Sequence, residues 1–577
     1  MRRLLENGAN SSFVSVAADT AVPIAAILER PQSRIGDVGH ARNPKIPLPS
    51  DLYAPTRRNS AGVEFGDRAS LARLLAEIRA AKLPASAAPI LNGEVHAGPD
   101  RPLLSPIDGN VIGRLSEATT ALASTAMACA QSGFAAWAAA PLELRAGCLE
   151  RAADMLEERR AGLIALLQVE GGKTLDDALA EVREAADLCR YYAAAARRTL
   201  APHAMPGPTG ESNELGYRGR GVFVCISPWN FPLAIFLGQV AAALVAGNAV
   251  VAKPAEQTPL IAGEAVRILH GAGVHESALH LVPGDGKIGA ALVGDARLAG
   301  VAFTGSTEVA RAINRALAAK EAPIVPLIAE TGGINPMIVD ATALPEQVTD
   351  DVVASIFRSA GQRCSALRLL CVQEDVADHV IEMVAGAARE LNLGDPRDPA
   401  THVGPVIDSE AKAKLDGWIA AMEREGRLRF RWDAFKPLPA SGAYVPPVIA
   451  MLDRARDLKE EVFGPILHVV RWSSDRLDAL LDDIAANGYG LTLGIHSRID
   501  ATAEHIAGQL ANGNVYVNRN MIGAVVGTQP FGGTGLSGTG PKAGGPNYLR
   551  RFAEEQVVTI NTAATGGNAS LLAAGED

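Results

Sequence analysis

The fold is decided by residues 221–253, which read GVFVCISPWNFPLAIFLGQVAAALVAGNAVVAK. Short apolar, β-rich runs open and close this stretch, and one apolar run of helix length lies between them. We therefore predict a buried strand, a buried helix over Leu233–Ala246, a Gly-Asn turn and a second buried strand over Ala249–Ala252. This order is typical of a parallel sheet covered by helices, so the predicted fold class is α/β.

The same stretch contains 20 uncharged residues, Leu233 to Ala252, which is long enough to cross a bilayer. Two prolines precede this run, and Gly238, Gln239 and the Gly-Asn pair interrupt it. These residues favour the buried helix and strand over a membrane span. The first residues of the chain begin basic but have no apolar stretch and no small-residue cleavage site, so we predict no secretory signal.

Outward from this stretch, strands and Ala-rich helices continue to alternate. Apolar spacing predicts helices upstream, at 121–138, 142–167 and 174–200, and β-rich runs predict strands downstream, at 279–282 and 300–303. A second α/β run extends from 327 to 517. Two such lobes predict a cleft between them, because ligands of open α/β sheets bind beyond the carboxyl ends of the strands.

The composition is that of a globular protein without a nucleic-acid partner. Hydrophobic residues make up 48% and charged residues 20% of the chain, and the net charge of −10 lacks the basic surplus of a nucleic-acid binder. Six cysteines in 577 residues are too few for a disulfide scaffold, and they contain no C-x-x-C pair. We therefore expect no metal site and a reducing, cytoplasmic location.

Three glycine motifs are candidates for phosphate binding. Residues 284–289 and 533–538 both match G-x-G-x-x-G, but neither has the downstream acidic residue of the dinucleotide fingerprint, so tight turns are the default interpretation. The motif FTGSTEV at 303–309 follows a β-rich run and opens a helix, which suits a phosphate at a helix N-terminus. A simple Ser/Thr N-cap explains this last motif equally well.

The best candidate nucleophile is Cys364, within GQRCSA at 361–366. It lies in a polar turn that begins with glycine, whereas Cys225 and Cys371 lie inside apolar runs. Arg363 beside it could favour the thiolate. Taken alone, the position leaves a structural cysteine as an open alternative.

Five motifs in this order along the chain resemble those of the aldehyde dehydrogenase superfamily. They are SPWNFP at 227–232, KPAEQTP at 253–259, ETGGINP at 330–336, GQRCSA at 361–366 and EEVFGP at 460–465. The resemblance covers roughly residues 95–555 and implies the aldehyde dehydrogenase fold, with a Rossmann-like NAD-binding lobe, an α/β catalytic lobe and a β oligomerisation arm. One departure is Ala310, which stands where the family often has glycine.

The resemblance implies a covalent mechanism. Cys364 would attack the aldehyde as a thiolate and give a thiohemiacetal, whose oxyanion the Asn230 side-chain amide and the Cys364 backbone N–H would hold. Glu330 would then activate water against the thioester.

The implied cofactor is NAD. Glu461 and Phe463 would position the nicotinamide ribose and ring, and Ser306 would contact the pyrophosphate. Lys253 and Glu256 would hold the adenosine ribose, where a carboxylate repels a 2′-phosphate and favours NAD over NADP. The full set of expected cofactor contacts is Ser227, Pro228, Trp229, Lys253, Glu256, Gly305, Ser306, Gly332, Glu461 and Phe463.

A further stretch, GAVVGTQPFGG at 523–533, resembles the substrate anchor loop of Δ1-pyrroline-5-carboxylate (L-glutamate γ-semialdehyde) dehydrogenases. That family implies that the N–H groups of Gly523 and Ala524 bind the substrate α-carboxylate. The expected remaining contacts are the Ser365 hydroxyl near the carboxylate, Phe231 and Phe531 around the aliphatic part, and Glu184 near the amino group. The expected reaction is NAD-dependent oxidation of L-glutamate γ-semialdehyde to L-glutamate, in proline catabolism.

The ends of the chain resemble the bifunctional proline utilisation A family. RRLLENGAN at 2–10 resembles the last helix of its proline dehydrogenase barrel, in which the paired arginines, here Arg2 and Arg3, hold the proline carboxylate. Residues 535–546 and 560–572 also look like that family. Without the rest of the barrel, we expect no proline dehydrogenase activity and no bound FAD.

The expected domain division follows from these resemblances. It comprises a barrel remnant at 1–40, a linker and helical segment at 41–94, an NAD-binding domain at 95–329 with a hairpin arm near 200–220, a catalytic domain at 330–554 and an oligomerisation tail at 555–577.

The expected partners are a small-molecule substrate and further copies of the chain. The resemblance implies a homodimer or higher homo-oligomer in which the hairpin and the tail cover an open sheet edge, and a proline dehydrogenase domain on a longer native chain. Two alternative functions stay open, a dehydrogenase for another carboxylated semialdehyde and a non-catalytic assembly module. The intact Cys364, Asn230 and Glu330 argue against the second.

Overall fold

A computed structural model describes residues 13–30, 32–33, 42–43, 45–433 and 438–562 of the chain. It divides into two compact units, Met1–Asn59 and Ser60–Asp577. The described part of the first unit contains the short helices α2 (Phe13–Ala18) and α3 (Ile24–Ile27) and the 3-10 turn η2 (Pro49–Asp51). Arg2 and Arg3, expected at the end of a former barrel, lie outside the described residues.

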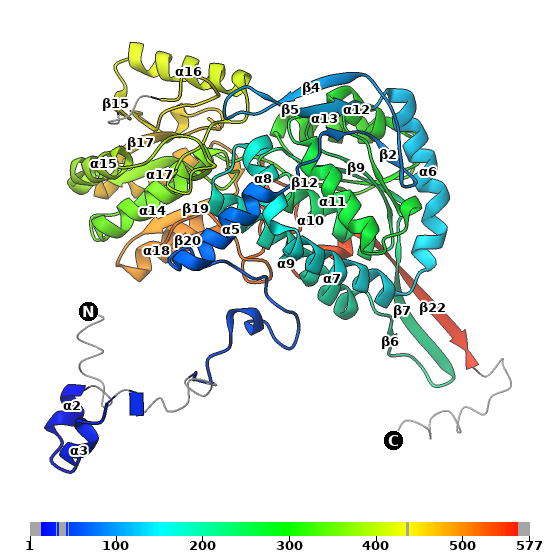
Figure 1. Cartoon of the computed structure of the whole chain (residues 1–577), viewed down its shortest axis with the longest axis horizontal. Coiled ribbons are helices and arrows are strands. Elements are labelled where there is room, and N and C mark those ends of the chain that lie inside the picture. The colour runs from blue at the N-terminus through cyan, green and yellow to red at the C-terminus, as the bar shows by residue number, and fades with distance from the viewer. Residues whose placement is uncertain (1–12, 31, 34–41, 44, 434–437, 563–577) are drawn as a thin grey trace. The chain divides into compact units, whose positions relative to one another are not determined.

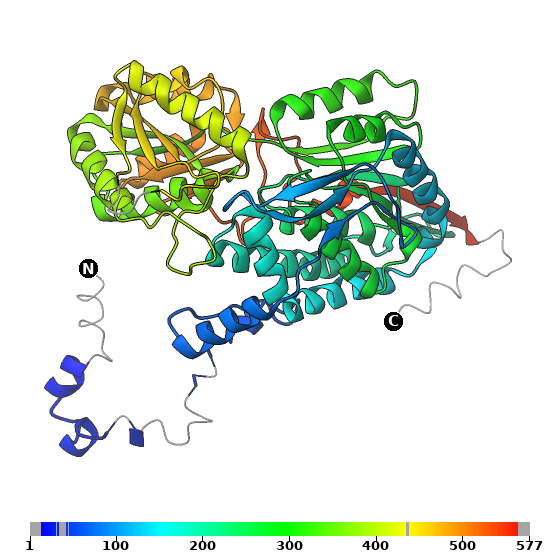
Figure 2. The ribbon, with the colours of Figure 1, turned by 45° about the horizontal axis from the view of Figure 1, so that its top comes forward.

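The second unit contains two lobes, each with a seven-stranded sheet (Figure 2). The first sheet has the order β12-β11-β8-β9-β10-β2-β3, in which the neighbours from β12 to β10 run parallel and the last two pairs antiparallel. Its strands are β12 (Leu327–Glu330), β11 (Leu298–Thr304), β8 (Val222–Ile226), β9 (Ala249–Lys253), β10 (Leu279–Leu281), β2 (Ile90–Leu91) and β3 (Glu94–Val95).

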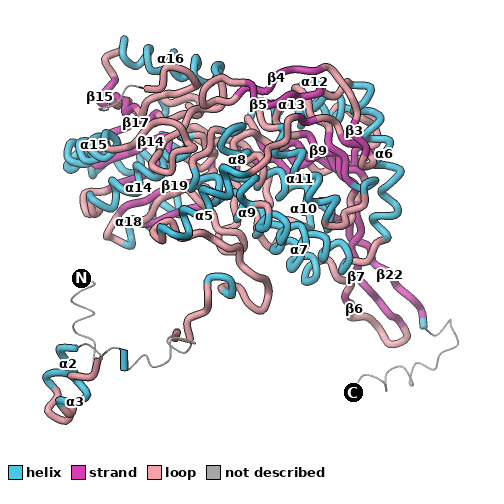
Figure 3. The backbone as a smooth tube through the Cα atoms, in the orientation of Figure 1, coloured by secondary structure: helices cyan, strands magenta, loops and turns pink. Residues whose placement is uncertain are grey.

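Helices surround this sheet and bury its apolar strands (Figure 3). They are α5 (Arg68–Ala80), α6 (Thr120–Ala139), α7 (Leu142–Glu158), α8 (Arg160–Gly171), α9 (Leu175–Thr199), α10 (Ala234–Val245), α11 (Pro259–Gly271), η3 (Glu276–Ala278), α12 (Gly286–Gly294) and α13 (Thr307–Ala318). A small sheet beside them has the order β1-β5-β4, from β1 (Ser86–Ala87), β5 (Val111–Ser116) and β4 (Asp100–Leu104).

The stretch that decides the fold forms the expected strand, helix and strand. Strand β8, helix α10 and strand β9 follow one another, and β8 and β9 pair in parallel from Val222 opposite Ala249 to Ile226 opposite Lys253. Almost all of α10 is buried, because it packs between the sheet and α9. No helix among the described residues is long and apolar enough to cross a membrane.

The second lobe has a sheet of order β15-β16-β17-β14-β13-β19-β20. Its strands are β15 (Leu428–Arg431), β16 (Val448–Met451), β17 (Ile466–Trp472), β14 (Leu367–Gln373), β13 (Asn335–Val339), β19 (Thr492–His496) and β20 (Asn514–Val517). The helices and turns of this lobe are α14 (Pro345–Phe357), η4 (Arg358–Gly361), α15 (Glu374–Arg389), α16 (Ser409–Arg424), η5 (Ala455–Asp457), η6 (Ser474–Arg476), α17 (Leu477–Ala485) and α18 (Asp500–Gln509).

The segment after β20 returns to the first lobe. It contains β21 (Thr534–Gly535), paired with β18 (Tyr489–Gly490), then η7 (Leu549–Phe552) and β22 (Ala553–Asn561). Strand β22 pairs along its length with β7 (Glu211–Gly219), which also pairs with β6 (His203–Met205). Figure 1 shows β7 and β22 side by side, projecting from the helices as an arm. Exposed apolar residues on this arm include Val557, Val558 and Ile560.

Local expectations differ from the structure in two places. The single helix expected over 142–167 is interrupted at Arg159, where the backbone leaves the helical region and α8 starts. The two G-x-G-x-x-G matches, for which tight turns are the default interpretation, contain the first residues of α12 and the short strand β21, respectively. Asp285 in the first match caps α12 by accepting hydrogen bonds from Lys287 and Ile288.

Candidate active site

One cavity of about 120 Å³ collects the residues predicted for substrate binding together with two predicted for catalysis. Its lining includes Glu184, Phe231, Glu330, Cys364, Ser365, Gly523, Ala524 and Phe531. Glu330 ends β12 of the first sheet, and Cys364 precedes β14 of the second. The cavity therefore lies where the carboxyl edge of one sheet meets the loops of the other lobe.

Cys364 lies in the loop between η4 and β14 and is partly exposed. Burial and the nearby carboxylates of Glu461 and Glu330 raise the pKa of this thiol to about 12. The expectation that Arg363 favours the thiolate is wrong. The Arg363 guanidinium turns away to Asp177 and Ser359, so its charge is already paired.

Glu330 is buried, and its carboxylate lies against a glycine-rich segment. Its Oε2 accepts a hydrogen bond from the Gly533 N–H at 3.3 Å, whereas Oε1 is buried without a partner among the described residues. Burial raises the pKa of Glu330 well above its ordinary value, and the hydrogen bond from Gly533 and the charge of Lys542 oppose that rise. A buried carboxylate oxygen with no partner is poised to accept a proton from water or from a thiol.

Asn230 reaches the loop of Cys364 from the first lobe. Its Nδ2 donates to the Gln362 carbonyl at 3.1 Å, two residues before Cys364. An amide nitrogen carries two hydrogens, so the second can donate to a ligand beside Cys364.

Gly523 and Ala524 present backbone donors to the cavity. Within the described ranges, neither N–H has an acceptor, and both residues line the cavity. Gly523 has φ of 80°, a conformation that glycine adopts without strain. Adjacent unpaired N–H groups form a site suited to a carboxylate.

Helix α9 contributes one whole face to the cavity. Glu184, Leu188 and Tyr192 are spaced four residues apart and so lie on one face of the helix. Burial and the neighbouring Glu181 raise the pKa of Glu184 to about 7, while Arg363 and Lys173 oppose the rise. Leu188 and Tyr192 were missed from the sequence, although this spacing after Glu184 was a usable signal.

Other lining residues were also missed. The Tyr192 hydroxyl accepts a hydrogen bond from the Gly544 N–H at 2.9 Å, and its ring stacks on Tyr548, which also lines the cavity. Gln239 donates to the Thr304 hydroxyl at 2.9 Å. These contacts join segments far apart in the chain, and no local motif signals them.

A second cleft, of about 480 Å³, shares Cys364 with the first cavity. Seven of the predicted cofactor residues line it, together with Asn230: Pro228, Trp229, Gly305, Ser306, Gly332, Glu461 and Phe463. Ser227, Lys253 and Glu256 are not part of its lining. Ser227 and Lys253 instead lie at the carboxyl ends of the paired strands β8 and β9. Ser306 caps α13, since its Oγ accepts from the Val309 N–H at 3.2 Å.

The lining of this cleft combines aromatic rings, a carboxylate and a glycine that leaves room for that carboxylate. Phe463 packs edge-on against Trp229 with 5.6 Å between ring centroids, and Arg368 holds Glu461 at 3.1 Å. A Cβ on Gly332 would collide with the Glu461 carboxylate, so only glycine leaves that carboxylate in place. The buried Ser227 hydroxyl has no partner among the described residues, and burial lowers the pKa of Lys253. Lys253 donates to the Pro254 carbonyl at 3.1 Å and Glu461 accepts from Arg368, so Ser227 is the one of these three groups that is unpaired among the described residues. A hydroxyl, an ammonium group and a carboxylate fit a dinucleotide.

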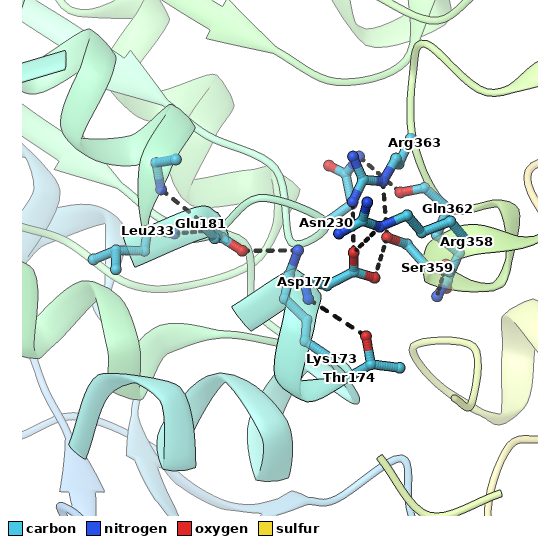
Figure 4. A network of polar contacts seen from close by, with 11 residues as sticks. Lys173, Thr174, Asp177, Glu181, Asn230, Leu233, Arg358, Ser359, Gln362 and Arg363 are labelled. Atoms are coloured by element: carbon cyan, nitrogen blue, oxygen red, sulfur yellow. Dashed lines mark hydrogen bonds and ion pairs between the residues drawn. The ribbon is translucent and has the colours of Figure 1, made fainter. Parts of the chain in front are cut away.

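A network of buried charges supports the cavity wall (Figure 4). Lys173 pairs with Glu181 at 2.7 Å, and Glu181 accepts the first N–H groups of the α10 segment, from Leu233 and Ala234. The Lys173 ammonium lies 4.2 Å from the centre of the Phe231 ring. Within the described part of the chain, no cluster of side chains is suited to hold a metal ion.

Comparison with known proteins places this geometry among relatives. The model of the "Aldehyde dehydrogenase family" matches residues 96–558. Bifunctional protein PutA of Klebsiella aerogenes is 48% identical over 568 residues, which cover 96% of this chain and 42% of that protein. The chain thus spans less than half of that relative's length.

Two crystal structures extend the comparison. A variant of proline utilization A (PutA) from Bradyrhizobium japonicum has a TM-score of 0.88 and 63% identity, covering 98% of this chain and 54% of that chain. A 1-pyrroline-5-carboxylate dehydrogenase from Thermus with bound NAD has a TM-score of 0.81 and 34% identity, covering 87% of this chain and 99% of that chain.

Proposed function

Because the chain belongs to the aldehyde dehydrogenase family, we propose that it oxidises L-glutamate γ-semialdehyde to L-glutamate with NAD. The observation that carries this proposal is the cavity in which Cys364 and Glu330 face the unpaired N–H groups of Gly523 and Ala524. A semialdehyde with a carboxylate at its far end matches that pairing of nucleophile and anion site. The 1-pyrroline-5-carboxylate dehydrogenase and PutA relatives support the same substrate.

The first step is addition to the aldehyde. The Cys364 sulfur bonds to the aldehyde carbon as the thiol proton leaves, and Glu330, with its raised pKa and unpaired oxygen, accepts that proton. The Asn230 amide and the Cys364 N–H hold the oxyanion of the thiohemiacetal. When bound, NAD supplies the hydride acceptor.

The second step releases the product. Glu330 first passes the thiol proton to solvent. Water then attacks the thioester on Cys364 while Glu330 takes a proton from that water, and the carbon–sulfur bond breaks with its electron pair on the Cys364 sulfur. Phe231 and Phe531 enclose the aliphatic chain of the substrate, Ser365 lies beside the carboxylate, and Glu184 faces the ammonium end.

NAD would be held along the cleft beside Cys364. Glu461 and Phe463 would orient the nicotinamide ribose and ring, while Gly332 leaves room for the Glu461 carboxylate. Gly305 and Ser306 would meet the pyrophosphate at the start of α13, with Pro228 and Trp229 opposite them. Ser227, Lys253 and Glu256 would meet the adenosine half, and the Glu256 carboxylate would disfavour a 2′-phosphate.

We also propose that the chain works as a homodimer or larger homo-oligomer in a reducing cytoplasm. The projecting β7–β22 arm with its exposed valines supports the first part, and six unpaired cysteines support the second. The PutA relatives support a proline dehydrogenase domain on a longer native chain. The change of sheet between Glu330 and Asn335 supports a boundary between NAD-binding and catalytic domains there.

Steady-state NADH formation from Δ1-pyrroline-5-carboxylate tests the proposal. We expect turnover with NAD and much weaker turnover with NADP, and none from a Cys364→Ala variant that still binds NAD. A folded wild-type protein that forms no NADH would overturn the function. Faster turnover of another carboxylated semialdehyde would favour the alternative substrate.

A further inference from the structure

The loop that precedes Cys364 has an unusual backbone. Ser359 and Ala360 have φ of 55° and 53°, and Gly361 follows at 69°. Residues with a side chain rarely adopt this left-handed region, and they persist there only when their surroundings hold them. Gly361 has no alternative, because a Cβ there would collide with the Gly464 carbonyl.

One buried carboxylate holds this turn in place (Figure 4). Asp177 on α9 accepts the Ser359 hydroxyl at 2.6 Å and the Arg363 guanidinium at 2.7 Å, although α9 belongs to the other lobe. Arg363 Nε also donates to the Ser359 hydroxyl at 2.8 Å. Asp177 therefore ties together the first and last residues of the segment 359–363.

The same carboxylate also takes a second arginine. Arg358 Nε donates to Asp177 at 2.7 Å, and the Asp177 side chain is 0% exposed. Burial alone would raise the pKa of Asp177, but Arg363, Arg358 and Lys173 hold it below its ordinary range. Asp177 is thus a fully buried anion, and its negative charge balances the positive charges of Arg363, Arg358 and Lys173.

The turn sets the position of the reacting groups. The carbonyl of Gln362, the residue directly after the turn, accepts a hydrogen bond from the Asn230 amide at 3.1 Å, and Cys364 is the second residue after Gln362. The Arg363 guanidinium that Asp177 holds also lies 5.4 Å from the centre of the Phe231 ring in the cavity wall.

We propose that Asp177 is a positioning residue, whose carboxylate holds the left-handed turn 359–361 and thereby fixes Cys364 opposite Asn230. The inference rests on the proposed function, in which these two residues act on the aldehyde. The alternative to this positioning role is that Asp177 only helps the two lobes to fold together.

Asp177→Asn tests the proposal, because asparagine has nearly the same shape as aspartate but carries no charge. Its single amide oxygen cannot replace a carboxylate that accepts hydrogen bonds from two guanidinium groups and a hydroxyl. The matched control is Asp176→Asn, since the neighbouring Asp176 also pairs with Arg358 but is 63% exposed. We expect kcat to fall at least tenfold in Asp177→Asn and less than twofold in Asp176→Asn.

Alkylation of Cys364 gives a readout that needs no aldehyde. Among the six cysteines, only Cys129 and Cys364 are not buried. In a Cys129→Ser background, the rate of reaction with iodoacetamide therefore measures the accessibility of Cys364. Burial raises the pKa of this thiol, and a loosened loop would expose it. We expect alkylation of Asp177→Asn to be at least threefold faster, with one adduct per chain by intact mass.

The outcomes separate this proposal from the proposed function. If the wild-type protein is inactive on glutamate semialdehyde, the proposed function is wrong. The ratio of alkylation rates between Asp177→Asn and wild type still tests the role of Asp177. Unchanged kcat and alkylation in Asp177→Asn would overturn the positioning role. Adducts on the buried cysteines would show that the variant has lost its fold, and the Ser359 variants then provide the test.

A second pair of variants covers the case in which Asp177→Asn does not fold. Ser359→Ala and Ser359→Gly both remove the hydroxyl, but glycine adopts a left-handed φ without strain. We expect the glycine variant to retain at least threefold more kcat than the alanine variant. Equal kcat values for the two would contradict the claim that the turn conformation matters.

Discussion

The side-chain amide of Asn230 donates a hydrogen bond to the Gln362 carbonyl at 3.1 Å, joining two loops that are 132 residues apart in the chain. This contact places the amide of one lobe two residues before Cys364, the proposed nucleophile, on the other lobe. It therefore defines where the oxyanion of an aldehyde adduct would lie.

Removal of that amide should slow the chemistry without weakening substrate binding. We expect Asn230→Ala to lower kcat by about 100-fold or more, because one oxyanion donor supplies about that factor, while KM changes little. Steady-state kinetics with NADH absorbance measures both. A variant with kcat within threefold of wild type would remove Asn230 from the mechanism.

Lys542 should control the pH at which Glu330 works. Its side chain and the Glu330 carboxylate both lie close to the Cβ position of Gly532, and its ammonium group donates to the Gly513 carbonyl. Since Lys542 opposes the burial that raises the Glu330 pKa, loss of its charge should raise that pKa further. The other titratable groups that interact with Glu330 are Cys364 and Tyr548. We expect the acid limb of the kcat–pH profile to move to higher pH in Lys542→Met.

The matched control is Lys542→Arg, which keeps the positive charge. Its acid limb should stay near the wild-type position. Equal shifts in both variants would show that packing on Gly532, rather than charge, is responsible.

The raised pKa of Glu184 leads us to expect that substrate affinity depends on pH. Its pKa is raised to about 7, so the carboxylate is ionised above that pH and protonated below it. Glu181, Asp187, Arg363 and Lys173 are the charged neighbours that interact with it. KM for the semialdehyde should rise as pH falls through 7, by up to about tenfold per pH unit.

Comparison with Glu184→Gln isolates this effect from the pH dependence of the substrate itself. We expect the variant to have a raised KM at pH above 7 and a flatter KM–pH curve than wild type. Parallel curves for the two proteins would exclude contact between Glu184 and the substrate ammonium.

Gly332 should be needed for cofactor affinity. A Cβ there collides with the Glu461 carboxylate, whereas Gly286, at the start of α12, has no heavy atom within 4 Å of its Cβ position. We expect Gly332→Ala to raise KM for NAD at least tenfold and Gly286→Ala to leave it within twofold. Equal values for the two variants would contradict the placement of Glu461 at the cofactor.

Residues in continuous motifs were predictable from the sequence, and residues joined only by tertiary contacts were not. The strand, helix and strand of 221–253 follow from local apolar patterning, and the predicted cavity residues other than Glu184 lie in recognised motifs. The role of Asp177 depends on arginines more than 180 positions away, as its pairing with Arg358 shows. The direction of the Arg363 side chain likewise follows from its hydrogen bond to Asp177, a partner that the local sequence does not reveal.

Trapping of the acyl-enzyme tests the central claim most directly. Glu330→Gln should form the thiohemiacetal and transfer the hydride more slowly, because water must take the thiol proton, and it should lose the base that hydrolyses the thioester, so the acyl-enzyme should accumulate. Mixed with glutamate semialdehyde and NAD, it should give one NADH per active site and a glutamyl adduct on the peptide that contains Cys364. NADH formation without that adduct, or the same burst from a Cys364→Ala variant, would contradict a covalent mechanism through Cys364.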